Sequence, residues 1–79
     1  MVKGLVLIRL SSGKEKNAIS QIKRVSGVKD VTATFGSWDC VAHVEAEELR
    51  SLASLIVSRI RDIAGVSNTD TLIEVKIDE

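Results

Sequence analysis

The sequence is short of the residue types that cross-link a protein or give it a strong charge. Among 79 residues there is one cysteine, Cys40, and no proline, and 11 basic side chains balance 11 acidic ones. A single cysteine excludes an internal disulfide framework and a cysteine-cluster metal site. The lack of net charge disfavours direct binding to nucleic acid, because duplex affinity comes largely from Lys and Arg. A domain this small and without cross-links is marginally stable, so we expect it to associate with copies of itself.

Long apolar runs are also missing. The longest uninterrupted run is Leu5 to Ile8, whereas a membrane-spanning helix needs roughly 18 residues. The chain does not open on a secretory signal, because the run from Gly4 is interrupted at Arg9 and no small-residue cleavage site follows. We therefore expect a cytoplasmic protein with no membrane partner. Since 44% of its residues are hydrophobic, the chain should fold, and its length indicates one domain over residues 1–79.

The chain does contain an internal repeat. The segment from Ile22 to Thr34 aligns without gaps onto the segment that begins at Ile60. In both copies an apolar helical tail ends just before a glycine, Gly27 or Gly65, and a valine then begins a β-branched run. This order of residues is typical of a helix C-terminus that leads into a strand, where glycine takes a left-handed backbone at little cost.

Hydrophobic periodicity extends from these two anchors and predicts strand, helix, strand in each half. The predicted strands are residues 2–10, 28–35, 40–44 and 69–77. The predicted helices are residues 14–25 and 47–63. Ser12 and Glu15 have the spacing of a capping box for the first helix. The duplicated pattern indicates an α+β, ferredoxin-like βαββαβ sandwich, with a four-stranded antiparallel sheet and two helices on one face.

Two apolar surfaces follow from this plan. The predicted core stripes of the helices are Ala18, Ile19, Ile22 and Val25, then Leu49, Leu52, Ala53, Ile56, Ile60 and Ile63. The sheet face without helices would carry Leu5, Leu7, Val41 and Leu72. Four large apolar side chains are a substantial surface to leave in water. We therefore expect the protein to dimerise through its sheet.

Catalytic chemistry has few candidates in this chain. His43 is the only histidine, and strand alternation places it on the same face as Asp39, so an Asp39–His43 hydrogen bond is one hypothesis. On that hypothesis the protein is a small dimeric ferredoxin-like barrel enzyme with His43 as acid or base. The simpler interpretation is a strand-face histidine without a catalytic task. Cys40 beside Asp39 has its thiolate disfavoured, and no phosphate loop, dinucleotide fingerprint or metal-spaced cluster is present, so we expect neither an enzyme nor a cofactor.

Two polar segments are candidates for binding a small molecule. In the loop from Gly36 to Asp39, glycine can turn peptide N–H groups toward an anion, while Asp39 offers an acceptor for an ammonium group. Together they could hold a zwitterion. The simpler interpretation is a hairpin turn in which Trp38 covers the edge of the core. The second segment contains Thr69 and Thr71, whose hydroxyls could donate to a carboxylate or could merely suit a strand.

The order and spacing of several motifs resemble the C-terminal ligand-binding domain, or RAM domain, of the Lrp/AsnC (feast/famine) transcription regulators. The motifs are Val25-Ser-Gly27-Val28, Gly36-x-x-Asp39, Glu45-Ala46-Glu47, and Gly65-Val66 leading to Thr69-x-Thr71-Leu72. The resemblance spans Leu5 to Ile77. It implies a ferredoxin-like domain whose dimers pair through their sheets and join into rings, commonly octamers, with amino acids bound in crevices between dimers.

Carried over by position, the resemblance implies which residues contact the amino and carboxylate groups of the ligand. These are Gly36, Ser37, Trp38, Asp39, Thr69 and Thr71. Trp38 stands where the family often has tyrosine, and Cys40 stands where a larger apolar residue is usual, so the resemblance does not extend to the size and side-chain preference of the pocket.

Full-length members of that family carry an N-terminal helix-turn-helix domain, whereas Met1 here leads directly into the first predicted strand. The resemblance therefore implies a stand-alone RAM domain, in agreement with the balanced charge. We expect an amino-acid-binding effector and oligomerisation module that acts on transcription through protein contacts. Its expected partners are copies of itself and a full-length Lrp/AsnC regulator.

Overall fold

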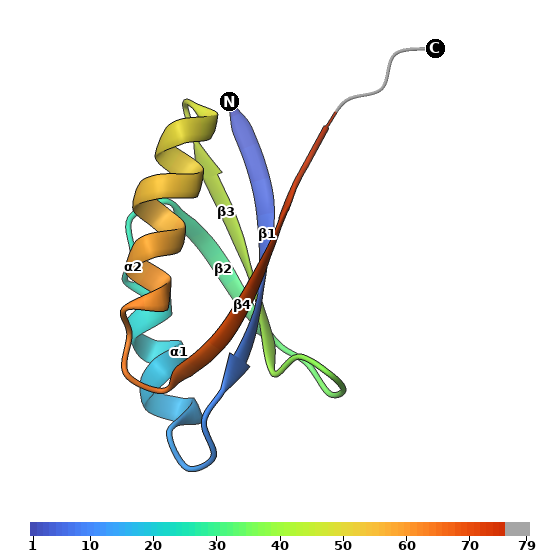
Figure 1. Ribbon diagram of the computed structural model, residues 1–79, viewed down its shortest axis with the longest axis vertical. Coiled ribbons are helices and arrows are strands. Elements are labelled where there is room, and N and C mark those ends of the chain that lie inside the picture. The colour runs from blue at the N-terminus through green and yellow to red at the C-terminus, as the bar shows by residue number, and fades with distance from the viewer. Residues whose placement is uncertain (76–79) are drawn as a thin grey trace.

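A computed structural model describes residues 1–75, and its secondary structure follows the predicted order (Figure 1). The strands are β1 (Val2–Leu10), β2 (Val28–Ala33), β3 (Cys40–Ala46) and β4 (Val66–Ile73). The helical segments are α1 (Glu15–Lys23), η1 (Ser51–Ile56) and α2 (Val57–Arg61). The predicted final strand is shifted, because β4 begins earlier than expected, and Ile77 lies outside the described residues.

The four strands form one antiparallel sheet in the order β2-β3-β1-β4, and the helices cover one of its faces (Figure 1). This order places the two central strands, β1 and β3, between the two strands that follow the repeated turns. The architecture is the expected ferredoxin-like α+β sandwich. No helix within residues 1–75 is long and apolar enough to cross a membrane.

The core lies between the sheet and the helices, where alternate residues of the central strands meet one stripe of each helix. Its buried members are Val6, Ile8, Leu10, Ala18, Ile22, Cys40, Ala42, Val44, Leu52, Ile56, Val57 and Ile60. The alternation predicted for the first strand is confirmed, because Gly4, Val6, Ile8 and Leu10 are all buried.

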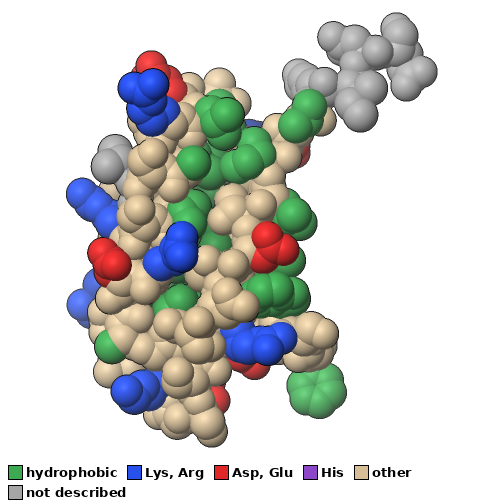
Figure 2. Space-filling model, viewed as in Figure 1, with side chains coloured by type: hydrophobic (Ala, Val, Ile, Leu, Met, Phe, Trp, Pro, Cys, Tyr) green, Lys and Arg blue, Asp and Glu red, His purple; other side chains and the backbone are tan. Residues whose placement is uncertain are grey.

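The opposite face of the sheet carries the predicted apolar patch, which we call the open face: Leu5, Leu7, Val41 and Leu72. Leu5 pairs with Leu72 on β4, and Leu7 pairs with Val41 on β3, so the four side chains are neighbours. Leu72 is half exposed and the other three are partly buried. In Figure 2 hydrophobic side chains line this side of the molecule.

The repeated glycine turns fold in the same way. In each copy two 3.1 Å backbone hydrogen bonds close the turn, from Val25 to Ile22 and Val28 to Val25, and again from Ile63 to Ile60 and Val66 to Ile63. Gly27 and Gly65 have φ angles of 99° and 100°, which lie in the region where a Cβ atom is unfavourable. The prediction of two equivalent helix-to-strand turns is confirmed.

The second helix departs from the predicted spacing. Its middle, η1, is a π-helix in which the N–H of Val57 donates to the carbonyl of Leu52, five residues earlier. This wider turn brings Val57 into the core and leaves Ala53 exposed, and Leu49 is also exposed. The expectation that Leu49 and Ala53 belong to the core stripe was wrong: Leu49 lies before this turn and is exposed, and Val57 takes the place of Ala53 beside Leu52, Ile56 and Ile60.

The capping box predicted for the first helix is also wrong. Lys14 occupies the N-cap position of α1 and makes no side-chain cap. Glu15 does reach back, but its carboxylate accepts a 2.9 Å hydrogen bond from the N–H of Gly13 rather than of Ser12. The N-cap of α1 lies two residues later than a capping box based on Ser12 would require.

Candidate functional site

The predicted binding loop is the connection between β2 and β3, and it projects from one end of the sheet (Figure 1). We call residues 34–39 the hairpin tip. Gly36 has a φ of 144°, which L side chains rarely adopt, and no atom would meet a Cβ built there. Gly36 and Ser37 are exposed, while Trp38 and Asp39 are half-buried. The glycine is therefore needed for backbone shape and not for space.

Arg9 at the end of β1 braces the hairpin tip. Its Nε and Nη2 atoms donate to the carbonyl of Ser37 at 3.2 and 2.8 Å. The guanidinium also lies over the ring of Trp38, 5.5 Å from the ring centroid, a distance at which a cation and an aromatic face attract. On the other side of the turn, Thr34 Oγ1 donates to the carbonyl of Trp38 at 2.6 Å. These contacts hold the loop in one shape.

Asp39 has a structural role that the sequence did not reveal. Its Oδ2 accepts a 2.7 Å hydrogen bond from the N–H of Leu10, and its own N–H donates to the carbonyl of Ile8 at 2.8 Å. Asp39 thus extends the pairing between β1 and β3 by one residue, immediately before β3 begins at Cys40. Its second oxygen, Oδ1, accepts no hydrogen bond from residues 1–75 and remains able to receive a ligand ammonium.

Thr69 and Thr71 lie on β4, opposite Ile8 and Val6 of β1. Directly paired residues share a sheet face, so both threonines point to the helix side, where they are half-buried. Thr69 lines a cavity of about 200 Å³ together with Arg61, Val66 and neighbouring residues of β4. Its N–H is occupied by the side chain of Asn68 at 2.9 Å.

The hairpin tip and Thr69 lie at the same end of the sheet, separated by β1. Ile8 accepts from Asp39 on one side and pairs with Thr69 on the other, so the two groups are about 10 Å apart across two strand spacings. Four cavities of the described residues have volumes of about 200 to 320 Å³, and none of these four is lined by residues 36–39 or by Thr71. None of these four cavities therefore encloses the six predicted residues.

His43 does not pair with Asp39. Its ring donates from Nδ1 to Asp30 Oδ1 at 2.6 Å, across the β2–β3 pairing and on the open side of the sheet. The predicted Asp39–His43 hydrogen bond was wrong, because Asp39 is held by the backbone of β1. The groove beside His43 includes Lys3, Glu45 and Glu74 but no hydroxyl or thiol side chain that could act as a nucleophile.

Cys40 is fully buried among the core residues. Burial raises the pKa of its thiol above the ordinary value, and the neighbouring charge of Asp39 raises it further. Since only the thiolate reacts, we expect iodoacetamide near pH 8 to modify the folded protein at least about tenfold more slowly than the urea-unfolded chain. Mass spectrometry of the quenched reaction measures both rates. Equal rates would show that the core opens freely.

The described residues offer no resident metal site, since within them no group of three or more His, Cys, Asp or Glu is placed to hold an ion. The functional contacts that sequence reasoning missed are those of Arg9 and Asp30. Both are charged residues within segments that the sequence predicts as strands. Their hydrogen-bond partners depend on the pairing register, which is a property of the folded sheet.

Comparison with known proteins identifies the family to which this chain belongs. The model of the family "Lrp/AsnC ligand binding domain" matches residues 3–77. An HTH-type transcriptional regulator of Pyrococcus furiosus is 31% identical over 71 residues, which are 86% of this chain and 47% of that protein. The chain spans 39% to 47% of the curated relatives that it matches.

Solved structures agree with the fold. Protein TTHA0845 from Thermus thermophilus is 25% identical, with a TM-score of 0.89 over 100% of this chain and 99% of that one. A transcriptional regulator from Neisseria meningitidis, solved as its L-Met complex, superposes with a TM-score of 0.82 over 95% of this chain and 50% of that one. At 10% identity that likeness shows the fold alone. On the family match, this chain belongs to the Lrp/AsnC ligand-binding domain family of transcription regulators.

Proposed function

We propose that this protein is a RAM-type effector domain, formed by residues 1–79, that binds an amino acid in a crevice between copies of itself. The observation that carries the proposal is the braced hairpin tip, where the Gly36 turn adjoins a carboxylate with one unused oxygen. A zwitterion needs an acceptor for its ammonium group and donors for its carboxylate. Asp39 would supply the first, and the N–H groups near Gly36 and Ser37 with the hydroxyls of Thr69 and Thr71 would supply the second.

The separation of these groups supports a site between subunits. The hairpin tip and the two threonines lie on different sides of β1 and line no common cavity among those described. A second copy that packed against this end could close the space between them. The open face would form the dimer, and dimers joined at their ends would form a ring such as an octamer.

Binding at a subunit boundary would make assembly depend on the ligand. A ligand shifts such an equilibrium only as far as it binds one state better than the other. We propose that the assembled form contacts a full-length Lrp/AsnC regulator in the cytoplasm and thereby changes transcription, without binding DNA directly. The neutral charge of the chain favours this route, because sequence-independent attraction to phosphates requires an excess of basic residues.

Thermal unfolding with each of the twenty amino acids tests the proposal. A ligand at 100 times its Kd stabilises the folded state by about 2.7 kcal/mol, which raises the Tm of a domain this size by roughly 10 °C or more. L-Met is a suitable first ligand because of the complex solved for the Neisseria protein. No shift with any amino acid at millimolar concentration would refute amino-acid binding.

The Asp39→Asn substitution locates the site once a ligand is found. Asparagine retains an acceptor oxygen for the N–H of Leu10 but loses the negative charge that attracts an ammonium group. We expect the Tm of the unliganded protein to change little and the ligand-induced shift to disappear. Asp62→Asn, at an exposed position after α2, is the matched control. Equal ligand shifts in both variants would place the site elsewhere.

A further inference from the structure

The hairpin tip carries the most exposed large apolar side chain in the described part of the protein. Phe35 is fully exposed, with a relative accessibility of 107%. It is one of only two aromatic residues in the chain, and the other, Trp38, lies in the same turn. None of residues 31–38 is charged. In Figure 2 a hydrophobic side chain projects at the lower right, at this end of the molecule.

Contacts within the single chain support the backbone of this tip. Arg9 holds the carbonyl of Ser37 and stacks on Trp38, and Thr34 closes the turn. Aromatic residues and arginine are the side chains most enriched at the energetic centres of protein interfaces. A rigid loop also loses little conformational entropy when it binds.

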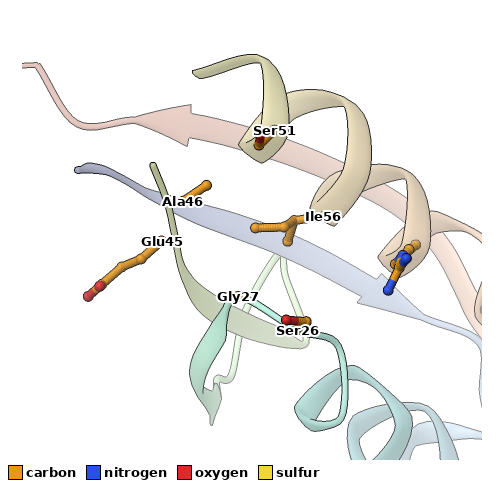
Figure 3. Close-up of a pocket in the computed structure, with 7 residues that line it drawn as sticks. Ser26, Gly27, Glu45, Ala46, Ser51 and Ile56 are labelled. Atoms are coloured by element: carbon orange, nitrogen blue, oxygen red, sulfur yellow. The ribbon is translucent and has the colours of Figure 1, made fainter. Parts of the chain in front are cut away.

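A complementary cavity lies at the opposite end of the β2–β3 hairpin (Figure 3). We call it the Gly27 cavity; its lining includes Ser26, Gly27, Ala46, Ser51 and Ile56, and its volume is about 320 Å³. Ile56 points from the helix toward Gly27, while the carboxylate of Glu45 points away from Ile56. An apolar cavity of about 150 Å³ holds a benzene molecule, so the volume of the Gly27 cavity is sufficient for a phenylalanine side chain. Arg59 also lines the cavity and could approach an aromatic face.

The tip cannot fill the cavity of its own chain. Gly27 precedes the first residue of β2 and the tip follows its last, and six residues of strand span about 20 Å. The two features therefore lie at opposite ends of one rigid hairpin. Any contact between the tip and the cavity therefore joins two molecules, and two copies of this chain supply both surfaces.

We propose that Phe35 of one copy inserts into the Gly27 cavity of a second copy. Such a contact is heterologous, because it joins different surfaces of identical chains, and repetition gives a closed ring or a filament. It leaves the open face free for the dimer. The inference deepens the proposed function by naming the contact between dimers, and it rests on that proposal only for self-association, not for ligand binding.

Light scattering coupled to size-exclusion chromatography tests how much the Phe35 side chain contributes to association between dimers. Because Phe35 is fully exposed, Phe35→Ala should leave the fold unchanged by far-UV circular dichroism while association between dimers weakens about 10- to 30-fold, as for an interface hot spot. Phe35→Leu should restore part of the association. An unchanged assembly in Phe35→Ala, or a wild-type protein that never exceeds a dimer, would overturn the proposal.

Cross-linking tests which surfaces meet. Ser37→Cys and Ser51→Cys chains, which both retain Phe35, should form a tip-to-cavity disulfide when mixed under mild oxidation, since Ser37 is exposed and the native Cys40 is buried. Lys16→Cys, on the exposed side of α1, replaces Ser51→Cys as the control and should not cross-link. If the only disulfides formed join two Ser37→Cys chains, the contact is tip to tip and the proposal is overturned. If these results are positive but no amino acid changes the Tm, the contact stands and the ligand proposal fails.

Discussion

Replacing Gly27 with alanine is expected to lower the free energy of unfolding by about 2–4 kcal/mol. Gly27 has a φ of 99°, and a left-handed backbone costs a residue with a side chain roughly 1–2 kcal/mol. A Cβ there would also collide with Cδ1 of the buried Ile56 and lie 3.1 Å from the carbonyl oxygen of Glu45. The end of the Ile56 side chain could move into the adjoining cavity, but the carbonyl oxygen of Glu45 belongs to β3 and cannot move without disturbing the sheet.

The Gly13→Ala substitution separates the two causes. Gly13 has a φ of 86°, but no atom lies within 4 Å of a Cβ built there, so only the backbone cost of roughly 1–2 kcal/mol applies. Urea unfolding at one fixed protein concentration measures both variants, since self-association adds to apparent stability. Equal losses in the two variants would contradict the close packing of Gly27 against Ile56.

Replacing Leu7 with lysine is expected to prevent dimerisation through the open face. Leu7 is central in that face and pairs with Val41 and with Asp70, so a lysine can find a counter-ion in the monomer. In a dimer the lysine and Asp70 would both be withdrawn from water, and desolvation costs several kcal/mol per ion, which their mutual attraction repays only in excellent geometry. The dissociation constant should rise by at least about 100-fold, as measured by sedimentation equilibrium.

Leu49→Lys is the matched control. Leu49 is also an exposed leucine, with a relative accessibility of 54%, but it lies on the helix side and should not affect the dimer. Far-UV circular dichroism establishes whether each variant is folded. A Leu7→Lys protein that is folded and dimerises as tightly as the wild type would rule out the open face as the interface.

Much of the fold could be predicted because its signals are local. The strand at residues 2–10 could be predicted because apolar side chains alternate toward one buried face. The turns at Gly27 and Gly65 could be predicted because glycine favours the left-handed backbone that they need. The second helix could not be predicted in the same way. Its π turn from Ser51 to Ile56 arises in a segment packed against the sheet, where tertiary contacts override the local preference for an α-helix.

The candidate site was predicted as a set of residues and not as an arrangement. The Gly36 turn could be located from its residue types, because glycine and aspartate favour turns. The partner of Asp39 could not, since its carboxylate bonds to Leu10, 29 positions away. His43 pairs with Asp30 for a similar reason, because the register of β2 against β3 brings together residues that the chain separates.

The sequence by itself determined the order of the elements, the position of the equivalent turns and the apolar open face. These follow from side-chain periodicity and backbone preference, which act within a few residues. Only the tertiary structure decided that Arg9 braces the hairpin tip, that Phe35 stands free, and that a cavity opens beside Gly27 at the other end. Those features depend on strand register and packing between distant segments, and they are the ones on which the proposed contact between copies rests.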